Sequence, residues 1–439
     1  MSRPPLPPGP FLLVGLARSG RAAGLILRAL GEQVTGCDGA AVAPEARAEL
    51  EAAGVPVHEH SDGVALLDGV GTVVKSPGVP GEAAVIRAAR ARGIVVLGEL
   101  ELGWRLLPNP LIAITGSNGK TTTTELVAAM HRAAGLPVAA AGNVGTALTA
   151  LAGALEPAAT VVCEASSFQL EDTLAFAPDA AVLLNLAPDH LDRHGSFAAY
   201  REAKLAIFAH QAADAVAVLP EALAAEVPTP ARRVLFGGDG DVTARDGALA
   251  WRGEPVLRAG EMRLRGQHNL ENAMAASAVC LARGLPIAAV AGALRTFAGV
   301  EHRLEEVGRY GGVLYVDDSK ATNVASAVVG IRSFPGGVHV ILGGRGKDED
   351  YAPLAAPVRE RCRAAYLVGE EGPRIGATLA GAAPTRECGD LEHAVAAARA
   401  AARPGEVILL SPACASYDQY GSFGERGEHF KALARAGGG

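Results

Sequence analysis

The chain has 439 residues and a formal net charge of −7 at pH 7, so it is too long for one hydrophobic core and only mildly acidic. Its basic residues are scattered, which argues against nucleic acid or an anionic membrane surface as a partner. The six cysteines are widely spaced without a C-x-x-C pair, and no apolar run approaches the ~18 residues of a membrane-spanning helix. We therefore expect a cytoplasmic α/β protein with reduced thiols and several domains.

The first segment alternates between strand and helix patterns and ends near Gly98. Strands are expected at residues 11–14, 33–37 and 71–75, and the helix after the first strand ends near residue 30. The loop GLARSG between them has Ala17 where a dinucleotide-binding loop has glycine. A dinucleotide and a shorter phosphate-bearing ligand, such as the pyrophosphate of a UDP-sugar, therefore both fit this loop.

The second segment opens with a buried strand at residues 111–114, the loop TGSNGKT at residues 115–121 and a helix at residues 122–131. Glycines let backbone N–H groups close around phosphate oxygens, Lys120 reaches the outer phosphates, and the hydroxyl of Thr121 can ligate Mg²⁺. The loop is shorter than the common phosphate-loop pattern, since Ile114 stands where that pattern has its first glycine. Phosphate binding is favoured over a plain strand-to-helix turn.

Two polar loops follow later strands of this segment, which are expected at residues 160–163, 180–184 and 215–219. Glu164 comes directly after the first and offers hard oxygen ligands for Mg²⁺, with a helix N-cap acid as the alternative. His190 follows the second and can bind a metal ion, with Asp189 or Asp192 orienting its ring. A solvated loop is the alternative for His190.

Three further residues have both a structural and a functional interpretation. Lys204 lies on a helix predicted at residues 197–208 and is solvated by default. Asn269, before a helix predicted at about 270–282, is either an N-cap or an adenine ligand. Arg303 is either an interdomain salt bridge or a guanidinium that reaches the γ-phosphate of ATP. A hairpin or loop is expected at residues 237–253.

The third segment again alternates strand and helix. Strands are expected at residues 313–316, 339–342, 365–368 and 407–410, with a helix at 394–402. The motifs DDSKATN, GGRGK and SPACASYD each follow one of these strands, where an open parallel sheet places its ligands. Their lysines, hydroxyls and backbone N–H groups suit a small carboxylated substrate.

Taken together, the motifs resemble those of the Mur ligases of the peptidoglycan pathway. The resemblance covers residues 11–433 and rests on TGSNGKT, AGNVG, EASSFQ, DHLDRH, HNLENA and EHR, in that order. The motifs DDSKATN and SPACASYDQY resemble those of the members that add D-glutamate. The short phosphate loop is that family's loop, so its departure from the common pattern supports the match.

The resemblance implies a fold of three α/β domains. These are an N-terminal Rossmann-like UDP-binding domain (1–98), a central P-loop ATPase domain with a mostly parallel sheet (99–299) and a C-terminal Rossmann-like domain that binds the amino acid (300–439). It also implies a monomeric ligase that uses ATP and two Mg²⁺ sites to join D-glutamate to UDP-N-acetylmuramoyl-L-alanine. The reaction passes through an acyl phosphate and a tetrahedral intermediate.

The same resemblance assigns site residues. Catalytic roles fall to Lys120, Glu164, His190 and Lys204, the last in carbamylated form. The metal ligands are Thr121, Glu164, His190 and Lys204. ATP is expected to contact Gly116, Ser117, Asn118, Gly119, Lys120, Thr121, Thr122, Asn269, Arg303 and Asp318. The UDP-substrate is expected to contact Arg18, Ser19, Asp38, Ser76, Asn143 and Ser166. D-Glutamate is expected to contact Lys320, Thr322, Lys347, Ser416 and Phe423.

Four alternatives remain open at this point. Folylpolyglutamate synthase shares the central and C-terminal architecture but lacks a UDP-binding domain, so residues 1–98 weigh against it. Sister Mur ligases with another amino acid acceptor are closer rivals. A nicotinamide dehydrogenase would leave the phosphate loop unexplained, and a catalytically silent nucleotide-binding module would leave the four catalytic residues without a role.

Overall fold

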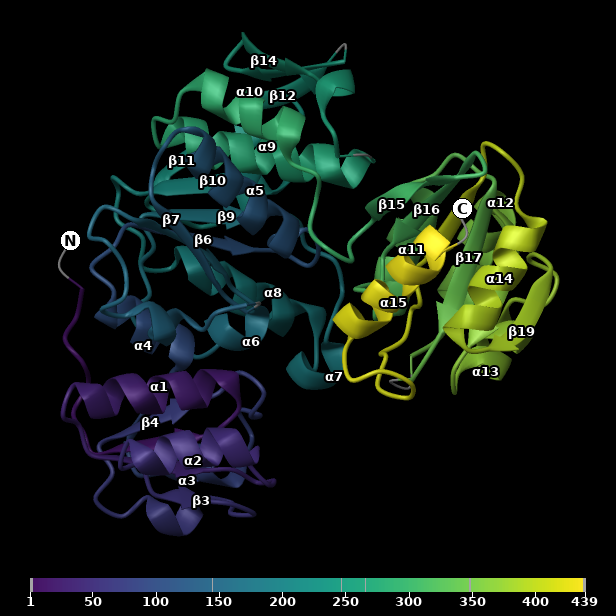
Figure 1. The fold of residues 1–439 in the computed structure, drawn as a ribbon. Helices are drawn as coiled ribbons and strands as arrows, with labels where there is room; N and C mark the ends of the chain where they lie inside the picture. The colour runs from purple at the N-terminus through teal and green to yellow at the C-terminus, as the bar shows by residue number, and fades with distance from the viewer. Residues whose placement is uncertain (1–2, 144, 246, 265, 347–348, 437–439) are drawn as a thin grey trace. The chain divides into compact units, whose positions relative to one another are not determined.

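The computed structural model describes residues 3–143, 145–245, 247–264, 266–346 and 349–436, which form an α/β fold with three separate sheets (Figure 1). The chain forms two compact units. One comprises Met1–Met262 with His268–Phe297, and the other comprises Arg263–Gln267 with Ala298–Gly439. The first unit contains two of the sheets and the second unit contains the third. The expected fold class is confirmed.

The first sheet has five parallel strands in the order β3-β2-β1-β4-β5. Its strands are β1 (Phe11–Val14), β2 (Val34–Cys37), β3 (Val57–His58), β4 (Thr72–Lys75) and β5 (Val95–Gly98), and its helices are α1 (Arg18–Ala29), α2 (Pro44–Ala52) and α3 (Ala84–Ala91). Apolar side chains on both faces of the sheet form two clusters, which explains why β1 and β4 are fully buried. All β1, β2 and β4 bounds lie within one residue of the predicted ones.

The second sheet has nine strands in the order β14-β13-β12-β11-β10-β9-β6-β8-β7, parallel from β7 to β12. Its strands are β6 (Leu111–Thr115), β7 (Val138–Gly142), β8 (Thr160–Glu164), β9 (Ala180–Leu183), β10 (Val216–Pro220), β11 (Arg232–Phe236), β12 (Val242–Arg245), β13 (Ala248–Trp251) and β14 (Glu254–Arg258). The last three pair antiparallel, so the hairpin expected at residues 237–253 is confirmed.

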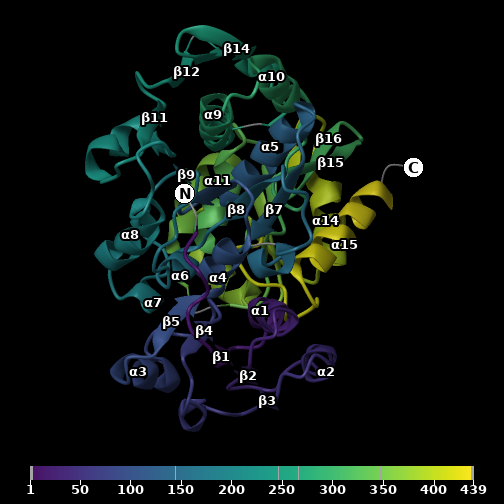
Figure 2. The same ribbon diagram turned by 90° about the vertical axis from the view of Figure 1, so that its left-hand side faces the viewer.

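Seven helices accompany this sheet: α4 (Glu99–Leu106), α5 (Lys120–Ala133), α6 (Ser167–Leu170), α7 (Leu191–His194), α8 (Phe197–Leu205), α9 (Gln267–Ala282) and α10 (Ile287–Thr296). Helix α5 lies against β7 and β8 and contacts α10 (Figure 2). Because α9 already begins at Gln267, Asn269 lies inside the helix and its interpretation as an N-cap is wrong.

The third sheet, in the second unit, has the order β15-β16-β20-β17-β18-β19 and is parallel except for the β15–β16 hairpin. Its strands are β15 (Glu305–Tyr310), β16 (Val313–Asp317), β17 (Val338–Gly343), β18 (Cys362–Val368), β19 (Thr385–Gly389) and β20 (Val407–Leu410). Its helices are α11 (Val324–Arg332), α12 (Ala355–Arg361), α13 (Gly372–Thr378), α14 (Leu391–Ala401) and α15 (Phe423–Ala436). Apolar clusters cover both faces, as a mostly parallel sheet requires.

Short polar side chains set where several of these helices begin. Ser166 and Gln169 form a capping box on α6, and Asn323 and Asp390 accept backbone N–H bonds at the starts of α11 and α14.

The six cysteines are free thiols. None of the described helices combines the length and the hydrophobicity that a membrane crossing requires.

Replacement of Gly20 by alanine tests the contact that places α1 on the first sheet. A Cβ atom at Gly20 would lie 1.9 Å from the carbonyl oxygen of Gly15, a backbone atom that already accepts a 2.7 Å hydrogen bond from Ser76 Oγ. We expect Gly20→Ala to lower the free energy of unfolding by about 1–3 kcal/mol, measured by urea denaturation. Gly39→Ala is the control, because its Cβ would meet open space. Equal midpoints for the two variants would contradict this account of the contact.

Candidate active site

The loop between β6 and α5 has the backbone shape of a phosphate-binding loop. Gly116 and Gly119 have φ values of +155° and +86°, which L side chains rarely adopt. A Cβ atom at Gly119 would lie 2.1 Å from Oδ1 of Asn272, so only glycine lets helix α9 approach the loop this closely. Lys120 Nζ donates to the carbonyl oxygens of Gly116 (2.9 Å) and Ser117 (3.0 Å), which places its ammonium group inside the loop. Thr121 and Thr122 follow in the buried first turn of α5.

The segment after β9 holds the tip of this loop. The side chain of Asn185 accepts a hydrogen bond from Asn118 N (2.9 Å) and donates one to Asn118 O (3.1 Å). Ser117 Oγ donates to Ala187 O and accepts from Ala187 N, both at 2.9 Å, and it also lies 2.9 Å from the hydroxyl of Tyr200. Hydrogen bonds therefore join the phosphate loop directly to the segment that leads to His190. Sequence analysis missed Asn185 and Tyr200.

Lys204 is buried beneath the phosphate loop, with only 1% of its surface exposed, so its interpretation as a solvated helix lysine is wrong. Its Nζ donates to Gly116 O at 2.7 Å and lies 4.7 Å from the ring centroid of Tyr200. Burial, and secondarily the nearby Lys120 ammonium, lower the pKa of Lys204 to about 7, against the opposing effects of Asp189 and Glu164. Much of this side chain is therefore a neutral amine near neutral pH.

Glu164 is the last residue of β8 and is 3% exposed. Its Oε1 accepts a hydrogen bond from Asn143 Nδ2 at 2.9 Å, whereas Oε2 is buried and has no hydrogen-bond partner among the described residues. The interpretation of Glu164 as a helix N-cap is wrong, because Ser166 caps α6. An unpartnered buried carboxylate oxygen, close enough to Lys204 to affect its pKa, fits a hard cation such as Mg²⁺.

His190 precedes α7 in a left-handed backbone conformation (φ 51°) that non-glycine residues adopt at some cost. Half of its side chain is exposed, its Nε2 lies 3.6 Å from Asp189 Oδ2, and its ring centroid is 4.8 Å from that of Phe168. Of the two acids expected to orient this ring, Asp189 is therefore nearby. The side chain of Asp192 lies outside the described part of the structure.

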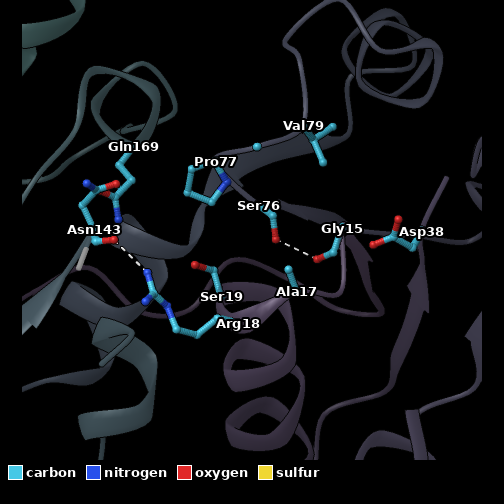
Figure 3. A pocket seen from close by; sticks show the side chains of 11 residues that line it. Gly15, Ala17, Arg18, Ser19, Asp38, Ser76, Pro77, Val79, Asn143 and Gln169 are labelled. Carbon is cyan, nitrogen blue, oxygen red and sulfur yellow. Dashed lines mark hydrogen bonds between the residues drawn. The ribbon is translucent and has the colours of Figure 1, made fainter. Parts of the chain in front are cut away.

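A cavity of about 410 Å³ lies beside the loop after β1 (Figure 3). It is lined by Gly15, Ala17, Arg18, Ser19, Asp38, Ser76, Pro77, Gly78, Val79, Asn143 and Gln169. Arg18 donates to Asn143 O at 2.7 Å across the cavity, while Asp38 at the opposite end accepts from Leu16 N at 2.8 Å. The N-cap residue of α1, Ala17, forms no side-chain cap, so the first N–H groups of this helix suit an anion.

Five of the six residues expected to contact the UDP-substrate thus line one cavity. Ser166 differs, because its hydroxyl accepts Gln169 N (3.3 Å) as part of the capping box. Gln169 itself lines the cavity and was missed by sequence analysis. Its position three residues after an N-cap serine was a signal for the capping box and gave no indication of a ligand contact.

In the second unit, Asp318 lies directly after β16 and is buried. Its Oδ2 accepts from Ser411 Oγ (2.7 Å) and its Oδ1 from Leu304 N (3.2 Å). Burial raises the pKa of Asp318 to about 7, against the opposing effect of Ser411 and of Arg303. The Nε of Arg303 is buried without a hydrogen-bond partner among the described residues.

Of the described residues expected to bind D-glutamate, Lys320, Thr322 and Ser416 follow the ends of β16 and β20 along the chain, and Phe423 begins α15. Lys320 Nζ is 4.5 Å from the ring centroid of Phe423, and Ser416 is buried. Thr322 follows Lys320 in the loop before α11, and Lys347 lies outside the described residues. Arg426, missed by sequence analysis, holds this region by donating to the hydroxyl (2.9 Å) and the carbonyl oxygen (2.9 Å) of Ser319.

Known proteins match the chain in the regions just described. Residues 114–280 match the model of the Mur ligase middle domain, and residues 302–414 match that of the Mur ligase glutamate ligase domain. The UDP-N-acetylmuramoylalanine–D-glutamate ligase of Acidobacterium capsulatum is 41% identical over 97% of this chain and 96% of its own. The enzyme of that name from Anaeromyxobacter dehalogenans is 43% identical over 99% of both chains.

A solved structure shows the same fold at lower sequence identity. UDP-N-acetylmuramate–alanine ligase from Thermotoga maritima superposes with a TM-score of 0.61, at 20% identity, over 97% of this chain and 99% of that one. The two domain matches and the full-length relatives agree with the order of motifs along the chain. The chain therefore belongs to the Mur ligase family.

Proposed function

We propose that this protein is the ATP-dependent ligase that adds D-glutamate to UDP-N-acetylmuramoyl-L-alanine during peptidoglycan precursor synthesis. The observation that carries the proposal is identity above 40% over nearly the whole chain with ligases of that name. The phosphate loop with Lys120, the buried Lys204 and the cavity beside β1 are the parts that such a reaction needs. We further propose that the protein acts as a cytoplasmic monomer, with domains at residues 1–98, 99–299 and 300–439.

The chemistry requires activation of a poor electrophile. The L-alanine carboxylate attacks the γ-phosphorus of ATP, ADP leaves, and an acyl phosphate forms. The amine of D-glutamate then attacks the carbonyl carbon, loses a proton, and phosphate leaves from the tetrahedral intermediate. Such phosphoryl transfer depends mainly on positioning and on neutralising the charge of the phosphates. In this proposal the loop backbone from Gly116 to Thr122 and the ammonium of Lys120 perform those tasks.

Thr121, Glu164, His190 and carbamylated Lys204 are the residues that would hold Mg²⁺, at two sites. When bound, Mg²⁺ neutralises phosphate charge and orients the γ-phosphoryl group. The unpartnered Oε2 of Glu164 supports this assignment. Asn143 is assigned to the UDP-substrate with Arg18, Ser19, Asp38 and Ser76, and Ser166 is assigned there from the family resemblance.

Carbamylation of Lys204 is consistent with its surroundings. The ammonium first loses one proton; the neutral amine then attacks CO₂, a C–N bond forms as one C=O π bond opens, and a second proton is released, so a cation becomes an anionic carbamate. The lowered pKa of Lys204, caused mainly by burial, supplies the neutral amine. The remaining assignments are ATP for Asn269, Arg303 and Asp318, and D-glutamate for Lys320, Thr322, Lys347, Ser416 and Phe423.

The proposed function predicts phosphate release that depends on one amino acid. Purified protein with ATP, Mg²⁺ and UDP-N-acetylmuramoyl-L-alanine should release phosphate when D-glutamate is added. L-Glutamate, L-lysine and meso-diaminopimelate, added in parallel, should give only the background rate. Release with another acceptor would move the protein to a sister ligase activity, and no release with any acceptor would refute ligase function.

Lys204→Ala should lose most of the ligase activity, because the variant cannot form the carbamate anion. Added short-chain carboxylic acids should partly restore the phosphate release rate by supplying a carboxylate in the vacated space. Lys204→Arg should also be inactive, since it keeps a positive charge and is not carbamylated. Glu202→Ala, an exposed position on the same helix, is the matched control. Full activity of Lys204→Ala would refute this role.

Asn185→Ala should weaken ATP binding about tenfold, because the loop tip loses two hydrogen bonds, each contributing about 0.5–1.5 kcal/mol. Calorimetric titration with a non-hydrolysable ATP analogue measures the effect. Asn185→Asp keeps the acceptor for Asn118 N but places a charged carboxylate oxygen against Asn118 O and near the bound phosphates, so it should weaken ATP binding at least as much as Asn185→Ala. Wild-type affinity in the alanine variant would mean that the loop holds its shape without Asn185.

A further inference from the structure

Arg193, three residues after His190, contacts a backbone carbonyl, a carboxylate and an aromatic ring. The Nη2 atom of Arg193 donates to the carbonyl oxygen of Val79 and to Oε1 of Glu171, both at 2.8 Å. The guanidinium carbon also lies 4.8 Å from the ring centroid of Phe168. These partners come from two different stretches of the chain, 114 and 22 residues away.

Val79 is part of the wall of the cavity beside β1, together with Ser76, Pro77 and Gly78 (Figure 3). Its carbonyl oxygen also accepts a 2.8 Å bond from Lys75 Nζ, so two cationic side chains hold the same backbone atom. A displacement of Arg193 therefore acts directly on the backbone that shapes this wall.

The charges around this carbonyl form a compact network. Lys75 is fully buried and pairs with Asp172 at 2.7 Å and with Glu171 at 3.4 Å. Glu171 also pairs with Arg193, and Arg90 lies 3.7 Å from Asp172, so three cations share two carboxylates in a short chain of contacts. The buried Lys75–Asp172 pair keeps a fixed geometry, because removal of one member leaves a buried charge without compensation. Arg193 and Glu171 are partly exposed and join this pair at its edge.

Phe168 connects the same network to His190. Its ring is 4.8 Å from that of His190, and it stacks on His194 at 5.3 Å with an interplanar angle of 16°. His190 has a positive φ of 51°, which the surrounding structure must hold in place. The guanidinium of Arg193 contacts both the ring of Phe168 and the carbonyl oxygen of Val79 in the cavity wall.

We propose that Arg193 is a positioning residue that fixes the loop of His190 to the wall of the nucleotide-sugar cavity, so that ligand binding in the cavity orders this loop. The proposal rests on the proposed function for the identity of the ligand. The other end of the loop is joined to the phosphate loop through Asn185. Residues 185–195 thereby connect the two substrate sites of the first unit, and Arg193 is the connection on the cavity side.

The test compares the full-length wild type with Arg193→Met, Arg193→Lys and Arg201→Met. Arg201, on helix α8, is the matched control. Like Arg193 it bonds both a carboxylate and a backbone carbonyl, here Glu226 Oε2 at 3.2 Å and Glu226 O at 3.0 Å. Calorimetry measures the affinity for UDP-N-acetylmuramoyl-L-alanine. Hydrogen–deuterium exchange measures how far this ligand slows amide exchange in residues 188–195.

In the wild type and Arg201→Met, the ligand should slow exchange in the loop. Arg193→Met should bind the ligand about tenfold more weakly, within the usual range of coupling between sites, and its loop should no longer respond. Arg193→Lys keeps the charge but not the planar fork, so both readouts should be intermediate. If Arg193 contributed only to stability, Arg193→Met would lower the thermal midpoint, yet the bound ligand would still slow amide exchange in residues 188–195, which would contradict the proposal.

Wild-type affinity together with wild-type loop protection in Arg193→Met would overturn the proposal. If that variant does not fold, Arg193→Lys decides by the same two readouts. Failure of the wild type itself to bind UDP-N-acetylmuramoyl-L-alanine would instead overturn the proposed function, and this proposal with it. The two failures are therefore distinguishable.

Discussion

The candidate active site of the first unit is arranged around one backbone carbonyl group, that of Gly116. The oxygen of Gly116 accepts hydrogen bonds from Lys120 Nζ (2.9 Å) and from Lys204 Nζ (2.7 Å), so the ammonium form of Lys204 places two positive charges beside one atom. Their repulsion contributes to the lowered pKa of Lys204. An anion near the loop, whether a phosphate or a carbamate on Lys204, relieves that repulsion. The loop is therefore electrostatically incomplete without its ligands, and the neighbouring residues are arranged around this point.

Strand order explains why the groups near this carbonyl meet. Within the sheet, β6 lies between β9 and β8, and β7 pairs with β8. The carboxyl ends of these parallel strands lie at one edge, so Glu164, Asn143 and Asn185 come beside the phosphate loop although they are far apart in the chain. The strand-end rule predicts this meeting from the sequence for Glu164, which directly follows an expected strand. Asn143 was assigned by the family resemblance alone, and Asn185 was missed.

The sequence predicts the bounds of several fully buried strands, since apolar runs of four or five residues mark strands such as β1 and β20. Less apolar strands, such as β3 and β19, were not predicted. Contacts between motifs do not follow from the sequence. Tyr200 and Arg193 look like ordinary helix and loop residues, and their partners lie on other strands and loops. Tyr200, Ile207 and Phe208 mark the buried side of α8 and the turn after it at helical spacing. The depth of Lys204 on that side could not be predicted, because a lysine there normally extends its ammonium group to solvent. Burial of a single charged side chain is decided by tertiary packing rather than by helical periodicity.

Several unfavourable features of the first unit lie at the same edge of the sheet. They are the paired ammonium groups of Lys120 and Lys204, the unpartnered Oε2 of Glu164 and the positive φ of His190. A strained backbone or an unsatisfied buried oxygen each costs on the order of 1–3 kcal/mol. A fold keeps such features where a ligand compensates them, so the ligand-bound protein gains stability that the free protein lacks. Three such features beside the phosphate loop mark this edge of the sheet as a place where a bound ligand would compensate them, which supports placing the chemistry there.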